Sequence, residues 1–172
     1  LVGSEMCIRD RYLKDAKLDF KMRTAMGQGK ERDALRDKAK AVTKKMRDNY
    51  VEGRLGLVID GTGKDYSKIT SQANQLKQIG YDVHMVFINT SLDVALERNR
   101  NRPRTVPEKI TIDSWNKVQK NIGAFQRFFG NKNFVIVDNN EISDNVFDMV
   151  GKQVRRMLSK KVDNPTANAW IE

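Results

Sequence analysis

Short apolar runs alternate with stretches of helical periodicity along most of this chain, and the alternation limits the folds that it can adopt. Three runs have the length and composition of strands buried on both faces: LGLVID at 55–60, VHMVFIN at 83–89 and FVIV at 134–137. Around them, apolar residues recur at steps of three and four, the spacing of amphipathic helices. Helices between strands supply the crossovers that parallel pairing requires, so we predict an α/β fold with a parallel sheet.

The expected helices have recognisable start and stop signals. They run from Glu31 to a stop at Gly53, from a cap at Asp65 to Gly80, from a cap at Thr90 or Ser91 into a run of arginines, from Pro107 to Gly130, and from about Val146 to Met157. The chain beyond Val162 contains Pro165 and is expected to be irregular.

Length, charge and the cysteine and histidine counts limit the classes of protein to which the chain can belong. The 172 residues suit one domain, and no apolar run approaches the roughly 18 residues of a membrane span, so no membrane partner is expected. Net charge is +10, from 32 Lys and Arg against 22 Asp and Glu, which attracts polyanions such as nucleotides or nucleic acid but equally suits scattered solubilising lysines. One cysteine and one histidine argue against a disulfide framework, a zinc site and a Ser-His triad. We expect a cytoplasmic protein.

The first eleven residues differ in character from the rest. LVGSEMCIRDR resembles the conceptual translation of a sequencing adaptor, so we expect residues 1–11 to be foreign and the gene to be truncated before Tyr12. The alternative is an ordinary frayed terminus. On the first interpretation, a partial domain covers 12–161 and a tail covers 162–172.

Polar clusters follow each predicted strand, at the sheet edge where open α/β folds bind ligands. They are Asp60-Gly61-Thr62-Gly63-Lys64, Asn89-Thr90-Ser91 and Asp138-Asn139-Asn140. In the first cluster, Asp60 is placed to hold Mg²⁺ through water. Gly61 and Gly63 let the backbone approach a phosphate, and Thr62 offers a hydroxyl. A plain turn at the end of a strand is the alternative.

A basic segment follows the third helical pattern. It contains Arg98, Arg100, Arg102 and Arg104, and Arg98 and Arg102 are four residues apart on one helical face. Guanidinium groups match phosphate oxygens, and the prolines at 103 and 107 favour a shaped lid over a continuous helix. A solvated basic face is the alternative. We interpret His84 as a satisfied core histidine. We interpret Trp115 and the apolar stripe that it begins as core residues of the helix after Pro107: Trp115, Val118, Ile122, Phe125 and Phe129.

These segments resemble a known family. VIDGTGKDYSKI, then LKQIGYDVHMVFINTSLDVALERNRNR, then RTVPEKI are similar to the central and C-terminal parts of P-loop kinases of the zeta-toxin type, phage-encoded members especially. The same order occurs in phage polynucleotide 5′-kinases. The resemblance covers roughly residues 31–140.

The resemblance implies phosphorylation of a hydroxyl by ATP or GTP with Mg²⁺. Zeta toxins phosphorylate UDP-N-acetylglucosamine, and polynucleotide kinases phosphorylate 5′-hydroxyl ends. By position, Arg98 and Arg102 would be lid arginines that contact the donor's phosphates, with Arg100 and Arg104 as further phosphate ligands. Asp60 and Thr62, with Gly61 and Gly63, would face the phosphates and the acceptor. Asn139 and Asn140 would lie near the base-binding loop. No antitoxin partner is evident.

The chain departs from the family in one respect. The phosphate loop G-x-x-x-x-G-K-[ST] is absent from the 172 residues, and so is the acidic segment that supplies the catalytic base. We therefore expect a parallel three-layer P-loop NTPase-like sheet that is incomplete, with open strand edges, weak nucleotide binding and a tendency to aggregate. The alternatives are an inactive remnant and a non-catalytic nucleic-acid-binding domain.

Overall fold

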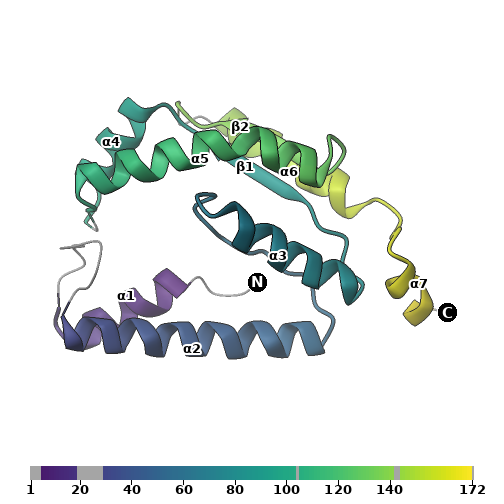
Figure 1. Ribbon diagram of the computed structural model, residues 1–172, viewed down its shortest axis with the longest axis horizontal. Helices are drawn as coiled ribbons and strands as arrows, with labels where there is room; N and C mark the ends of the chain where they lie inside the picture. Colours follow the sequence, from purple (N-terminus) through teal and green to yellow (C-terminus); the bar gives the residue numbers. More distant parts are fainter. Residues whose placement is uncertain (1–4, 19–28, 104, 142–143, 172) are drawn as a thin grey trace. The chain divides into compact units, whose positions relative to one another are not determined.

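The computed structural model describes residues 5–18, 29–103, 105–141 and 144–171, and its chain divides into two compact units (Figure 1). The first unit consists of Leu1–Gly61 and Leu96–Thr111, and the second consists of Thr62–Ala95 and Ile112–Glu172. Among the described residues, no helix combines the length and apolar character that crossing a bilayer requires.

The first unit is helical. It contains α1 (Glu5–Asp15), α2 (Lys30–Glu52), the second half of α4 (Leu92–Asn101) and the start of α5 (Glu108–Phe129). The helix α1 packs against α2, with Leu13 and Ala39 buried. As predicted, α2 ends at Gly53, whose amide donates to the Asn49 carbonyl at 2.9 Å.

The segment 55–60 is not a strand, so the prediction of a buried strand there was wrong. Its residues have no regular secondary structure, and Leu55, Val58 and Ile59 are exposed. The sequence has the apolar character of a strand, but a strand forms only where a neighbour pairs with its amides and carbonyls. Among the described residues, no strand pairs with this segment.

The second unit contains the sheet. Its elements are α3 (Tyr66–Gln78), β1 (Met85–Asn89), β2 (Phe134–Asp138), α6 (Asp144–Leu158), α7 (Pro165–Ile171) and most of α5. The two strands pair in parallel, in a register that runs from Met85 opposite Phe134 to Asn89 opposite Asp138. The parallel α/β prediction is therefore confirmed in a small sheet of two strands. Asp65 caps α3 as predicted, accepting from the Lys68 amide at 3.0 Å.

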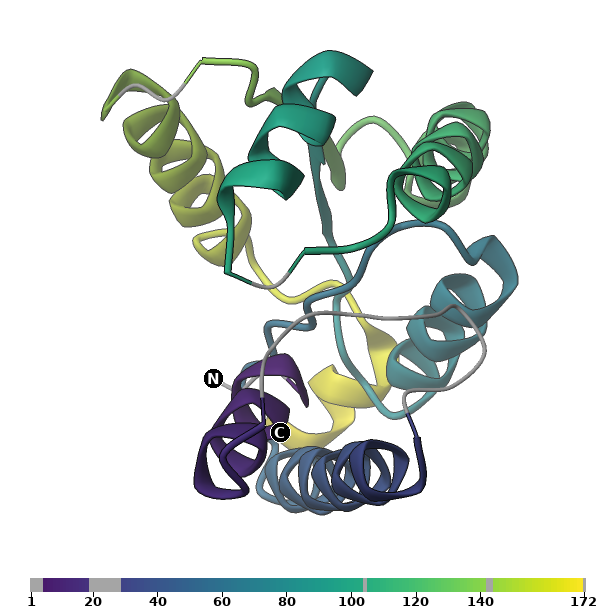
Figure 2. The same ribbon diagram turned by 90° about the vertical axis from the view of Figure 1, so that its left-hand side faces the viewer.

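An aromatic core lies between this sheet, α3 and α5. Its buried members are Ala73, Phe87, Phe125, Phe129 and Phe134. Phe125 lies at its centre, with ring centroids 5.2 Å from Tyr66, 6.4 Å from Phe129 and 6.5 Å from Phe87. The apolar stripe predicted for α5 is thus the surface that covers the sheet. The helix α6 contacts β2, and Figure 2 shows α5 and α6 on different sides of the strands.

The chain from 163 to 171 is largely helical, against the expectation of an irregular tail. It forms α7, and the Asn164 side chain donates to the carbonyls of Lys77 at 2.8 Å and Tyr81 at 3.3 Å. Trp170 of α7 covers the turn at Gly80, where a Cβ atom would lie 2.6 Å from the indole ring. Gly80 has φ +104°, so both its backbone conformation and this close approach require glycine.

His84, just before β1, is only partly what the sequence suggested. It is half-buried, but its Nδ1 atom is buried with no hydrogen-bond partner among the described residues. Burial lowers the pKa of His84 below its usual 6.5, and the nearby Lys160 charge lowers the pKa further. Asp82 and the Asn133 side chain act in the opposite direction without reversing the shift.

This shift predicts a pH-dependent stability. The unfolded chain takes up the His84 proton near pH 6.5, whereas the folded chain takes it up only at lower pH. The contribution of His84 is therefore fully present above pH 6.5 and is lost as the pH falls from there through the lowered pKa. Urea unfolding between pH 7.5 and 5 should show this loss in the wild type. The loss should be smaller in His84→Gln, and equal slopes in both proteins would contradict the assignment.

Candidate functional site

Polar side chains meet at the carboxyl ends of β1 and β2, within the second unit. The Asn139 amide donates to the Asn89 carbonyl at 2.9 Å, which extends the strand pairing by one bond. The Asn140 side chain accepts from the Ser91 amide at 2.7 Å and donates to the Asp138 carboxylate at 2.6 Å. We call Asn89, Ser91, Asp138, Asn139 and Asn140 the strand-end cluster. The sequence prediction that the polar residues after these two strands lie together is confirmed.

The helix α5 fixes this cluster from the side. Gln119 donates through Nε2 to the Asn89 side-chain oxygen at 2.8 Å, and Trp115 donates through Nε1 to the Thr90 carbonyl at 2.9 Å. Trp115 is half-buried, so its indole ring has a structural role at the sheet edge. Gln119 was not among the residues that the sequence singled out. The sequence could have indicated it, because the amide side chain of Gln119 comes one helical turn after Trp115, beside the apolar stripe of this helix.

The glycine loop before α3 is also held by α5. Asn121 donates through Nδ2 to the carbonyls of Gly63 at 3.0 Å and Lys64 at 3.1 Å. Gly63 is buried, has φ +75°, and a Cβ there would lie 3.6 Å from the Phe87 ring. A Cβ at that distance would make an ordinary contact, so it is the left-handed backbone conformation that favours glycine at this position. Gly61 and Thr62 are exposed, and their phosphate contacts stay predictions.

Asp60 lies at the end of the exposed segment 55–60, in the first unit, and not at the end of a strand. Across the part of the chain that the structure describes, no three His, Cys, Asp or Glu side chains gather as a metal site would require. A single exposed carboxylate suits Mg²⁺ that arrives bound to a nucleotide and keeps most of its waters. The residues present therefore fit a role for Asp60 with Mg²⁺ that a nucleotide brings, and they do not fit a metal site built from the protein alone.

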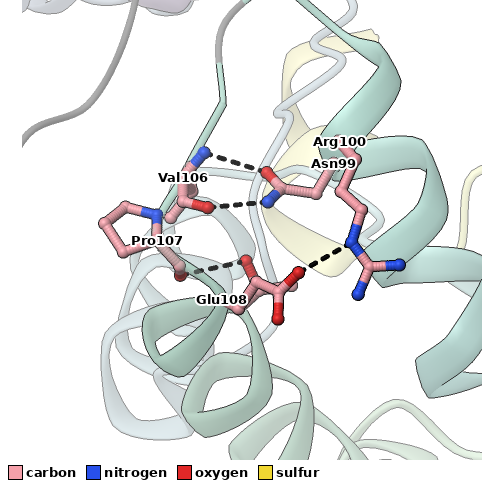
Figure 3. Close-up of polar contacts among 6 residues, drawn as sticks. Asn99, Arg100, Val106, Pro107 and Glu108 are labelled. Atoms are coloured by element: carbon pink, nitrogen blue, oxygen red, sulfur yellow. Dashed lines mark hydrogen bonds and ion pairs between the residues drawn. The ribbon is translucent and has the colours of Figure 1, made fainter.

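Arg98 and Arg100 on α4 and Arg102 just beyond it belong to the first unit, and the buried side chain of Asn99 contacts Arg102. Asn99 is 4% exposed, and it exchanges two hydrogen bonds with the backbone of Val106 (Figure 3). Its Nδ2 donates to the Val106 carbonyl at 2.6 Å, and its Oδ1 accepts from the Val106 amide at 2.9 Å. The same Oδ1 accepts from Arg102 Nη2 at 3.0 Å. The Asn99 side chain thus joins the end of α4 to the backbone at Val106.

Arg100 has a different partner from Arg102. Its Nε donates to Glu108 Oε1 at 2.7 Å, and this hydrogen bond and the carboxylate charge raise the pKa of Arg100 above its usual value (Figure 3). Glu108 therefore offsets part of the charge of the segment. Arg98 is half-buried on α4 and Arg102 is exposed just beyond its end. Arg104 lies outside the described residues.

The predicted site residues thus fall into two groups, one in each unit. Arg98, Arg100, Arg102, Asp60 and Gly61 belong to the first unit, and Thr62, Gly63, Asn139 and Asn140 belong to the second.

Comparison with known proteins identifies the family. The zeta toxin family model matches residues 20–148, which is more than half of the chain and includes both groups of predicted site residues. No curated protein and no solved structure matches the chain. Zeta toxins are a family of P-loop kinases that use ATP, in agreement with the resemblance of the strand, helix and arginine segments. The chain belongs to the zeta toxin family.

Proposed function

We propose that the protein is an ATP-dependent kinase that transfers a phosphoryl group to a hydroxyl of a nucleotide sugar or another small molecule. The observation that supports this most strongly is the family match over residues 20–148, which includes the arginines at the end of α4 and just beyond it. In the proposed reaction the acceptor oxygen bonds to the γ-phosphorus and the bond to the β-phosphate oxygen breaks. The hydroxyl proton leaves to a base that we assign to none of the 172 residues.

Arg98 and Arg102 bind the phosphates of the donor in this proposal. Phosphoryl transfer needs little covalent help from the protein and depends mainly on positioning and on neutralising charge. Guanidinium groups suit this task because their planar N–H donors match phosphate oxygens in pairs. Arg100 adds to the positive potential, although its pairing with Glu108 limits its share. Arg104 is proposed as a fourth ligand from its sequence position alone.

The remaining groups have narrower roles. Asp60 holds nucleotide-borne Mg²⁺ through water, and Thr62 with Gly61 and Gly63 lines the phosphates. When bound, Mg²⁺ neutralises charge that develops on the phosphate oxygens. The Asn139–Asn140 turn contacts the nucleotide base, and the support for it is the rigid strand-end cluster. The kinase acts in the cytoplasm, with a nucleotide and a small hydroxyl compound as its partners.

The test is phosphoryl transfer by the gene product that contains these residues. We expect labelled γ-phosphate to pass from ATP to UDP-N-acetylglucosamine in the presence of Mg²⁺, and Arg98→Ala with Arg102→Ala to abolish the transfer. Transfer to 5′-hydroxyl DNA ends instead would favour the polynucleotide kinase alternative. Lack of transfer to either acceptor, with ATP and Mg²⁺ present, would count against a kinase.

The 172 residues by themselves should bind ATP weakly. They contain no G-x-x-x-x-G-K-[ST] sequence, the loop whose amides and lysine cradle the β- and γ-phosphates. Isothermal titration calorimetry with MgATP should therefore give no micromolar dissociation constant. A micromolar, magnesium-dependent affinity would show that another segment replaces this loop.

A nucleic-acid-binding module is the second candidate, favoured by the net charge of +10. Binding through several phosphates would weaken steeply between about 50 and 200 mM salt, by a factor of about 10³ or more. A kinase for small molecules would instead respond to magnesium and ATP and bind duplex DNA negligibly at the higher salt.

A further inference from the structure

The end of the chain lies outside residues 20–148 of the family match, yet it is attached to the second unit at several places. We call residues 160–171 the C-terminal clasp. We propose that protonation of His84 releases this clasp from the turn between α3 and β1, so that the segment is an acid-sensitive strap. The inference goes beyond the proposed kinase activity, because it uses none of the residues assigned to phosphate, metal or nucleotide base.

Two hydrogen bonds attach the start of the clasp. The Lys160 Nζ atom donates to the Lys132 carbonyl at 3.0 Å, in the turn before β2. The Asp163 amide donates to the Asp82 carboxylate at 3.3 Å, just before β1. Both bonds are exposed, so water can replace either partner at a small cost in free energy. These two ties are therefore the part of the clasp that a nearby charge can disrupt most easily.

The rest of the clasp is held at the end of α3. The Asn164 side chain donates to the carbonyls of Lys77 at 2.8 Å and Tyr81 at 3.3 Å. The last carbonyls of a helix have no partner within the helix, so Asn164 supplies one from outside. The Trp170 indole then covers the turn at Gly80. Trp170 is thus placed to report whether the clasp is bound.

His84 is close to both side chains that make the first two ties. Three side chains act on its ring: Lys160 from the clasp, Asp82 from the turn before β1 and Asn133 from the turn before β2. The Nδ1 atom of His84 is buried and has no hydrogen-bond partner among the described residues. A charge on His84 would therefore act on Lys160 and Asp82 together.

A proton on His84 weakens both ties. Both ring nitrogens of an imidazolium are donors, so the buried Nδ1 atom then needs an acceptor, and a buried donor without one costs free energy. The positive ring also repels Lys160, and it attracts the Asp82 carboxylate in competition with the Asp163 amide. When the clasp leaves, water reaches Nδ1 and Lys160 moves away, so the released form takes up the proton more readily.

The direction of the pH dependence follows from this coupling. While the clasp is bound, burial and the Lys160 charge lower the pKa of His84 below its usual 6.5. Release brings the pKa back toward that value, so release takes up a proton and becomes more favourable as the pH falls below 6.5. His84 is the single histidine of the sequence, so no other imidazole contributes in this range.

NMR of the tryptophan indole N–H groups in the whole 172-residue chain tests the proposal. Trp170, assigned with Trp170→Phe, reports on the clasp, and Trp115, which donates to the Thr90 carbonyl, reports on the rest of the second unit. Between pH 7.5 and 5, the Trp170 signal should move to the position of an exposed indole, with a midpoint below pH 6.5. The Trp115 signal should keep its position. A Trp170 signal that does not move, or that moves only together with Trp115, would overturn the proposal.

Substitutions around His84 separate its charge from the general charge of the chain. His84→Gln should abolish the movement of the Trp170 signal, and its persistence would assign the transition to another group. Lys160→Gln removes one tie and the charge that opposes the proton, so its midpoint should lie at a higher pH than that of the wild type. The matched control is Lys161→Gln, at the exposed neighbouring position, which should keep the wild-type midpoint. Equal midpoints in the two lysine variants would contradict the role of Lys160.

Asn164→Ala tests the coupling from the side of the clasp. It removes the bonds to the two carbonyls and the side-chain oxygen that accepts from the Thr166 amide at 2.9 Å. The released fraction should therefore rise about tenfold or more at neutral pH. Because such coupling is reciprocal, the His84 ring signals should then titrate closer to pH 6.5 than in the wild type. A released Trp170 signal with an unchanged His84 titration would show that the two are uncoupled, and the proposal would fail.

Discussion

Replacing Phe125 with alanine is expected to lower the free energy of unfolding of the second unit by about 3–5 kcal/mol. Phe125 is 0% exposed and its ring meets Tyr66, Phe87 and Phe129, so alanine would leave a cavity between α3, α5 and β1. Urea unfolding followed by tryptophan fluorescence measures this change, because both tryptophans, Trp115 and Trp170, belong to the second unit.

The matched control is Phe147→Ala on α6. Phe147 is 69% exposed, so the same substitution removes little buried surface and should change the unfolding free energy by no more than about 0.5 kcal/mol. Similar losses in the two variants would mean that the aromatic cluster is not the core of this unit. A large loss of stability in Phe125→Ala alone would show that the aromatic cluster is tightly packed.

The helices and two of the strands were predictable because local signals and tertiary packing agree there. The caps at Asp65 and Gly53 and the stripe through Phe125 mark helices without knowledge of their neighbours. The run at 134–137 became a strand because β1 pairs with it and α6 contacts it, although Ile136 remains 47% exposed. The run at 55–60 has the same apolar character and did not, because strand formation depends on a partner that no local pattern reveals.

The candidate site was also predictable only in part. The polar residues after the two paired strands were predicted, and the side chains that hold them from other segments were not. The strand-end cluster follows from a general rule, that parallel strands bring their carboxyl ends to one edge. Asn99, Gln119 and Asn121 were missed because each acts on backbone or side chains of another segment. An asparagine between two arginines appears in the sequence as part of a basic surface. Only the structure reveals that Asn99 is buried and closes the connection to Val106.

The second large effect concerns two valines in apolar runs that the sequence could not distinguish. Val137 on β2 is 1% exposed, whereas Val58 in the segment 55–60 is 66% exposed. Val137→Lys should destabilise the second unit by about 3–5 kcal/mol, because it buries a charge without a partner. Val58→Lys should change the unfolding free energy by no more than about 0.5 kcal/mol, because its side chain already lies in water. Urea unfolding of both variants measures the difference.

Val58→Lys should also slow aggregation. An exposed apolar segment outside any sheet can pair with the same segment of another chain, and a lysine in it opposes that pairing. Light scattering at increasing protein concentration should therefore rise later for Val58→Lys than for the wild type. Asn145→Lys, which adds the same charge at an exposed position of α6, is the control for net charge and should delay it less. A loss of stability in Val58→Lys as large as in Val137→Lys would show that the segment 55–60 is packed in solution, and that its apolar run is a strand after all.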